Sequence, residues 1–282
     1  MIDNSIIGRR SSLNVLRIIP HGAILDGGDL GDILLPKRYV SDELVDGDAV
    51  DVFVYFDSED RIVATTEQPY VMRDQFAFLD VKEANKIGAF MDWGLQKDLF
   101  VPFREQKATI QANGNYLIYC YYDHESERLV GSTKTLKFLD TVPPEYQKGE
   151  EVTILITDEH ELGFRCIINH LHSGMIYKNE IFTPVYVGTS YKAYIKLIRE
   201  DEKIDVSLQP IGTTFSKSKK DPILEYLNAH DGVMFITDKS EPEMIYEAFG
   251  MSKKTFKKAV GHLYKEQRIR IEKDRIILLN RD

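Results

Sequence analysis

The sequence predicts a mainly β fold, with three small barrels in tandem and a C-terminal module of three helices and a β-hairpin. Three observations support this prediction. Segments repeat at a nearly constant offset through the first three quarters of the chain. Each copy is rich in short β-branched and aromatic runs, and the last quarter changes to helical periodicity. Five short strands in about 70 residues suit a closed barrel, because closure removes the exposed edges of a flat sheet.

The repeat rests on matched blocks in the first two copies. Residues 23–26 (Ala-Ile-Leu-Asp) match residues 89–92 (Ala-Phe-Met-Asp) at an offset of 66. A weaker third copy lies 75 residues after the second, as Gly163 follows Gly88. The remaining blocks pair residues 33–36 with 99–102 and residues 61–66 with 128–133.

The repeat divides the chain into unit one (1–66), unit two (67–137), unit three (138–215) and a tail (216–282). The formal net charge of −9 at pH 7 argues against a polybasic nucleic-acid binder. The charge is uneven, at −6, −1, −5 and +3 for the four parts in order. Phosphate is therefore repelled most by units one and three.

Unit two shows its strands most clearly. Asn-Gly and Ser-Glu turns around residues 113–115 and 125–127 separate runs of β-forming residues. In unit one, Val50, Val52 and Val54 alternate with other residues, as in a half-buried strand. The strands expected in unit two cover residues 76–83, 87–93, 98–102, 116–122 and 129–132.

The tail has the pattern of a winged helix, which is three helices followed by a hairpin. A polar linker over residues 214–220 precedes it, and the first helix is expected over 222–230. A capping box at 240–243 begins the second helix, which Gly250 ends. The other expected elements are a third helix from Ser252 to about Glu266 and two strands over 268–272 and 275–279.

Residues 88–102 (Gly-Ala-Phe-Met-Asp-Trp-Gly-Leu-Gln-Lys-Asp-Leu-Phe-Val-Pro) resemble the signature of the RNA-binding S1 domain, an OB-fold barrel. Residues 188–208 resemble the last strands of that domain, and residues 238–243 and 249–260 resemble the winged helix of the conserved virulence factor B family. The resemblance is strongest in unit two and the tail and weakest in unit one. It implies three tandem S1-like OB-fold barrels before a winged-helix domain, and an RNA-binding protein that is not an enzyme.

In S1 domains two aromatic rings on neighbouring strands stack RNA bases, and the resemblance places them at Phe90 and Phe100. Because Ala89 and Met91 flank Phe90 and strand faces alternate, Phe90 points outward if those two point inward. The alternative is that both rings belong to the core. The corresponding positions are Ile24 and Leu34 in unit one, and Arg165 and Met175 in unit three.

Three more residues complete the expected RNA-binding site. Trp93 follows Phe90 by three residues, Lys97 lies in the loop between the two strands, and Arg104 follows the third strand. Aromatic rings with nearby cations are typical of single-stranded RNA sites. A core position is the alternative for Trp93.

The third helix of the tail carries basic residues around an apolar face made by Phe256, Ala259, Val260 and Leu263. The helix has no Asn to read adenine, so sequence-specific DNA recognition is not expected. Contact with an RNA backbone or with a protein is expected, and a solvated face is the alternative. The residues concerned are Lys253, Lys254, Lys257, Lys258, Lys265, Arg268 and Arg270, with Lys273 and Arg275 on the wing.

Residues 1–10 lack the apolar core of a signal peptide, and no apolar run approaches the roughly 20 residues that span a bilayer. Two cysteines, Cys120 and Cys166, do not make a disulfide framework. We therefore expect a cytoplasmic protein.

Catalytic motifs such as a Walker loop or a Gly-x-Ser-x-Gly elbow are absent, so we expect neither enzymatic activity nor a cofactor. Two patterns are incomplete metal sites. Residues 26–32 lack the ligand spacing of an EF-hand, and His170, His172 and Cys166 lack a fourth zinc ligand. We expect an ordinary turn in the first case and no metal in either.

The leading hypothesis is a regulatory protein that binds single-stranded RNA through unit two, with the winged helix adding cationic contacts. The alternative is an interaction scaffold that contacts proteins of the transcription, translation or RNA-decay machinery, favoured by the acidic units one and three. A DNA-binding repressor is third.

Overall fold

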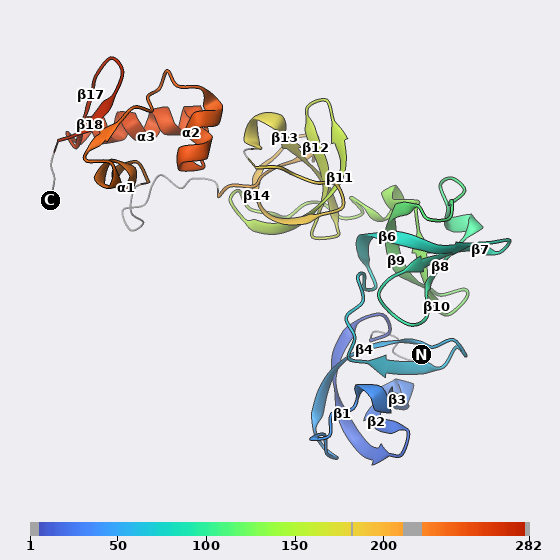
Figure 1. Cartoon of the computed structure of the whole chain (residues 1–282). Helices are drawn as coiled ribbons and strands as arrows, with labels where there is room; N and C mark the ends of the chain where they lie inside the picture. The colour runs from blue at the N-terminus through green and yellow to red at the C-terminus, as the bar shows by residue number, and fades with distance from the viewer. Residues whose placement is uncertain (1–5, 182, 211–221, 280–282) are drawn as a thin grey trace.

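The computed structural model describes residues 6–181, 183–210 and 222–279. Four modules follow one another along the chain (Figure 1): three β modules, then a helical module with a small sheet. The predicted mainly β fold is confirmed. The expected linker over 214–220 lies outside the described residues.

Unit one is a closed barrel with strand order β1-β2-β3-β5-β4. All its pairs are antiparallel except β3 with β5, where Leu34 meets Val63. Side chains that alternate along the strands, such as Leu25, Ile33 and Leu35, fill the barrel core. The strands are β1 (Arg10–Ile19), β2 (Gly22–Asp26), β3 (Asp32–Pro36), β4 (Ala49–Phe56) and β5 (Ile62–Thr65).

Unit three repeats this barrel with strand order β11-β12-β13-β15-β14. Its parallel joint again lies between the third and fifth strands, where Met175 meets Asp205. The strands are β11 (Glu151–His160), β12 (Gly163–Ile168), β13 (His172–Tyr177), β14 (Ser190–Ile198) and β15 (Ile204–Ser207).

Unit two keeps the same cyclic order, but its sheet is open between β8 and β10. Unit two is therefore a half-barrel of the same OB-like type, in which β8 and β10 do not complete the ring of hydrogen-bonded strands. Side chains fill this seam, since a Cβ placed on Gly131 of β10 would lie 2.8 Å from the Val101 side chain of β8. The strands are β6 (Gln75–Ala84), β7 (Gly88–Asp92), β8 (Leu99–Pro102), β9 (Asn115–Asp123) and β10 (Arg128–Ser132).

One glycine recurs at the start of the second strand in every unit. Gly22, Gly88 and Gly163 have φ values of 152°, 155° and 157°. A Cβ at these positions would approach the carbonyl oxygen of the neighbouring strand to 2.0, 2.6 and 1.8 Å. Any larger residue would push the second and third strands apart, which explains why the repeat keeps glycine here.

The tail folds as a winged helix around Phe256, Leu227 and Ile245. Ser252 caps the third helix as predicted, accepting a hydrogen bond from the Thr255 N–H at 3.1 Å. The tail elements are α1 (Pro222–Ala229), β16 (Val233–Met234), α2 (Pro242–Phe249), α3 (Lys253–Lys265), β17 (Ile269–Ile271) and β18 (Ile276–Leu278).

Two details of the tail differ from the prediction. The second helix begins at Pro242 with Glu241 as its N-cap, because Ser240 instead accepts a hydrogen bond from the Thr237 N–H. The sequence also did not predict β16, a two-residue strand that pairs with β18 and makes the sheet three-stranded.

Units two and three meet through a small apolar cluster. Phe76 of unit two packs with Leu155 and Ile167 of unit three. His170 stacks on the Phe76 ring at 6.4 Å, and its Nδ1 accepts the Phe76 N–H at 3.0 Å. Burial lowers the pKa of His170, which keeps the ring neutral and able to accept this hydrogen bond.

Candidate nucleic-acid interface

A groove with a cavity of about 760 Å³ lies where unit one meets unit two. The β4–β5 turn of unit one forms one wall, and β7, β8 and the start of β10 form the other. Figure 1 shows unit one directly beside unit two at this joint. The aromatic and charged residues that line it include Phe56, Asp60, Phe90, Lys97, Phe100, Arg104 and Arg128.

Phe90 and Phe100 form a ring pair on the wall of this groove. They are cross-strand partners in β7 and β8, and their ring centroids are 5.1 Å apart with 37° between the planes. Both side chains are half-buried, whereas the flanking Ala89 and Met91 are fully buried. Strand alternation therefore points the ring pair out of the core and into the groove, as expected.

The other two units have no ring pair at the same place. Ile24 pairs with Leu34 across β2 and β3, and Arg165 pairs with Met175 across β12 and β13. These cross-strand pairs confirm the register of the sequence repeat. Of the three repeats, unit two is thus the one with aromatic rings at this position.

Trp93 does not fit the predicted stacking role. Its side chain is 3% exposed and packs edge-on against Phe53 and Tyr55 of unit one, at centroid distances of 5.8 and 6.4 Å. The indole Nε1 donates to the Lys97 carbonyl oxygen at 2.5 Å. Because a base needs an open ring face, the expectation for Trp93 is wrong, and the ring instead joins units one and two.

Lys97 lies in the loop between β7 and β8, as predicted, and lines the groove, but its Nζ already has partners. Its Nζ donates to the Asp60 carboxylate at 2.8 Å and to the Asp57 carbonyl oxygen at 2.6 Å. The second oxygen of Asp60 accepts from Arg128 at 2.5 Å. The hydrogen bond from Lys97 lowers the pKa of Asp60, so this carboxylate is charged at neutral pH.

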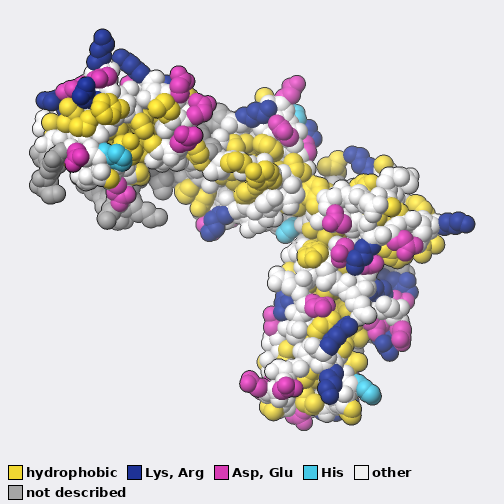
Figure 2. All heavy atoms as spheres, in the orientation of Figure 1, with side chains coloured by type: hydrophobic (Ala, Val, Ile, Leu, Met, Phe, Trp, Pro, Cys, Tyr) yellow, Lys and Arg dark blue, Asp and Glu magenta, His cyan; other side chains and the backbone are white. Residues whose placement is uncertain are grey.

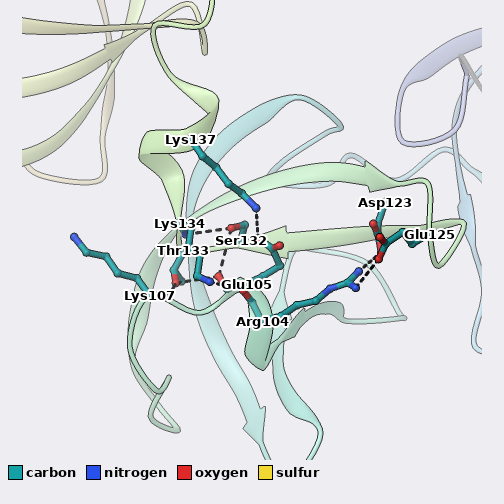
Figure 3. Close-up of polar contacts among 9 residues, drawn as sticks. All are labelled: Arg104, Glu105, Lys107, Asp123, Glu125, Ser132, Thr133, Lys134 and Lys137. Atoms are coloured by element: carbon teal, nitrogen blue, oxygen red, sulfur yellow. Dashed lines mark hydrogen bonds and ion pairs between the residues drawn. The ribbon is translucent and has the colours of Figure 1, made fainter.

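Arg104 also lines the groove and is already paired (Figure 3). Its guanidinium contacts Asp123 at 2.5 Å and Glu125 at 2.9 Å. Beside it, Lys137 donates to the Glu105 carboxylate at 2.6 Å. Burial opposes ionisation of Glu105, yet the Lys137 hydrogen bond helps to hold its pKa below the usual range.

The basic residues of the tail are largely exposed, and several of them lie at one end of the winged helix in Figure 2. Lys257 approaches Asp238 at 3.9 Å and Arg270 pairs with Glu272 at 3.1 Å. Within the described residues, no ion pair is formed by Lys253, Lys254, Lys258, Lys265 or Arg268.

The two incomplete metal patterns have ordinary structural roles. Residues 26–32 connect β2 and β3, and Asp26 accepts the Gly28 N–H at 3.0 Å. His172 contacts the Tyr146 hydroxyl at 2.9 Å and the Val142 carbonyl oxygen at 2.8 Å. In the described part of the chain, no group of three or more metal-ligating side chains is found.

Sequence reasoning missed Asp60, Arg128 and Phe56 as groove residues. Arg128 was part of the repeat block that matches Arg61, and Asp60 lies in the equivalent turn of unit one. The repeat could thus have located both turns, but it carries no information on which turn docks against another unit.

Two segments of the chain match known domains. Residues 221–278 match the CvfB-like winged helix domain, and residues 7–67 match the S1 domain. The chain is 25% identical to conserved virulence factor B of Staphylococcus aureus strain USA300, over 98% of this chain and 95% of that protein. Over nearly its whole length, this chain is similar to the conserved virulence factor B (CvfB) family.

Other similar proteins also match this chain over most of its length. The uncharacterized protein YitL of Bacillus subtilis strain 168 is 26% identical over 93% of this chain and 90% of its own length. A solved multidomain protein with nucleic acid binding domains from Streptococcus pneumoniae TIGR4 is 24% identical, covering 98% of this chain and 99% of its own, with a TM-score of 0.40. The S1 match falls on unit one, where the sequence resemblance was weakest.

No helix in residues 6–181, 183–210 and 222–279 has both the length and the apolar composition to cross a membrane.

Proposed function

We propose that this chain is a nucleic-acid-binding regulator of gene expression that holds single-stranded RNA in the groove of unit two. The observation that carries the proposal is the ring pair, Phe90 and Phe100, which faces the groove instead of the core. We place this activity in the cytoplasm, in keeping with the two free, buried cysteines, Cys120 and Cys166.

The ring pair offers a stacking platform that does not depend on bulk charge. Base–aromatic stacking contributes about 1–3 kcal/mol per base and tolerates any base. Two rings could therefore supply about 2–6 kcal/mol that does not depend on the net charge of the protein, which is −9. Stacking also requires unpaired bases, which favours single-stranded RNA over a duplex.

The winged helix would add electrostatic contacts. Lys254, Lys258, Lys265 and Arg268 are exposed, and the tail is the one part of the chain with a positive net charge. Lysine binds a phosphate as a point charge without reading bases. We therefore assign the contacts with the RNA phosphates to the winged helix and the contacts with the bases to unit two.

The decisive experiment measures the affinity for a short oligouridine of a full-length double variant, Phe90→Ala with Phe100→Ala. The matched control is Ile24→Ala with Leu34→Ala, which truncates the same two positions in unit one. The proposal expects at least a 30-fold loss for the first variant and little change for the second. Unchanged affinity of a folded Phe90/Phe100 variant would refute the proposal.

A second candidate is docking of the winged helix to a protein of the transcription, translation or RNA-decay machinery. Large apolar side chains are exposed on this module, including Phe235 at 67% and Tyr264 at 55%. A protein partner retained after nuclease treatment, together with no RNA binding by the purified chain, would favour this candidate.

A further inference from the structure

The two cations beside the ring pair are held by a carboxylate from a different unit. Asp60 belongs to the turn between β4 and β5 of unit one, whereas Lys97 and Arg128 belong to unit two. One oxygen of Asp60 accepts from Lys97 at 2.8 Å, and the other accepts from Arg128 at 2.5 Å. The carboxylate thus spans the two cations, as the two non-bridging oxygens of a phosphodiester would.

The surroundings fit a phosphate position. Lys97 and Arg128 line the same groove as Phe90 and Phe100. An RNA whose bases stack on the two rings would therefore bring its phosphates near the two cations. After loss of Asp60, Lys97 would keep its place, because its Nζ also donates to the Asp57 carbonyl oxygen at 2.6 Å. The fold therefore holds the cations in place, and the Asp60 carboxylate takes the position that a phosphate would fill.

The arrangement is particular to unit one. The equivalent turn residues Glu127 and Glu202 share the left-handed backbone of Asp60, with φ of 54°, 60° and 60° respectively. Within the described residues, neither Glu127 nor Glu202 takes part in an ion pair. The turn is thus a general feature of the repeat, whereas its contact with a neighbouring unit is not.

We propose that Asp60 is a built-in competitor for the RNA phosphate, so that unit one limits the affinity and salt dependence of the groove in unit two. This inference rests on the proposed function of the ring pair. The Asp60 side chain is 43% exposed and that of Arg128 is 56% exposed, and ion pairs at such exposure contribute little stability. A phosphate can therefore displace the carboxylate at low cost.

The test compares the full-length chain with Asp60→Asn, using an eight-nucleotide oligouridine at 50 and 200 mM salt. Asn keeps the shape and the left-handed backbone but removes the charge. Affinity at low salt should rise about fivefold, the effect of removing one unit charge about 4 Å away in water. The slope of log affinity against log salt should steepen by about 0.7, the value for one phosphate on a single strand.

Two further variants serve as a control and as a replacement. Glu59→Gln removes a neighbouring charge in the same turn, where Glu59 forms an ion pair with Arg61, and should leave affinity and slope unchanged. Asp60→Gly also suits the left-handed backbone and replaces Asp60→Asn if that variant does not fold.

The outcomes separate this inference from the proposed function. If Phe90→Ala with Phe100→Ala abolishes binding while Asp60→Asn matches the unaltered chain, the inference fails and the proposed function stands. If only the Asp60 variants bind, Asp60 is the competitor that we propose. If no variant binds oligouridine, or if Glu59→Gln acts like Asp60→Asn, the inference is overturned.

Discussion

Replacing Trp93 by Ala should destabilise the chain and uncouple units one and two. The side chain is 3% exposed and contacts Phe53 and Tyr55 across the joint between the units. Truncation of a buried Trp costs about 3–5 kcal/mol through lost burial and the cavity left behind. Trp93→Phe keeps most of the ring and loses the hydrogen bond to the Lys97 carbonyl oxygen, which should cost about 1 kcal/mol.

The assay is urea unfolding followed by far-ultraviolet circular dichroism, because Trp93 is the only tryptophan and its fluorescence disappears with the substitution. In the unaltered chain that fluorescence reports directly on the joint. The Ala variant should unfold at lower urea with an early transition from unit one, and the Phe variant should lie between the two. An Ala variant with unchanged unfolding would refute the burial argument. Loss of RNA binding at unchanged stability would restore Trp93 as a stacking residue.

Two other perturbations test separate parts of the structure. Lys254→Glu with Lys258→Glu should flatten the salt dependence of oligouridine binding by up to about 1.4 in slope. The control is Lys148→Glu, at an exposed position of unit three, and an equal slope in both variants would exclude α3 from the interface. His170 has a lowered pKa in the folded chain and accepts the Phe76 N–H. Below about pH 6.5 the unfolded state therefore binds a proton before the folded state does, and the stability of the chain should fall. His170→Asn should flatten this part of the curve in thermal unfolding, and identical pH profiles would contradict the assignment.

The repeat made most of the barrel architecture predictable from the sequence. The offsets of 66 and 75 place Ile24, Phe90 and Arg165 at the same strand position, and the structure pairs each with the expected partner. Local chemistry was equally informative at Ser252 and Gly250, since a cap and a left-handed C-terminal glycine act within one helical turn.

Contacts between units were not predictable in the same way. Trp93 is buried by Phe53 and Tyr55, and Asp60 is held by Arg128, yet nothing in the local pattern of either residue indicates its partner. Hydrophobic periodicity identifies the face of a strand but not the neighbouring module that covers it. The open seam of unit two and the two-residue strand β16 also depend on tertiary packing.

The most direct test of stacking in the groove is the oligouridine affinity of Phe90→Leu with Phe100→Leu. These substitutions keep apolar side chains at both positions, as Ile24 and Leu34 do in unit one, and remove only the aromatic faces. Stacking predicts an affinity loss of about 30-fold or more with a nearly unchanged melting temperature. Full affinity in this variant would contradict the account, because binding would then not depend on the rings.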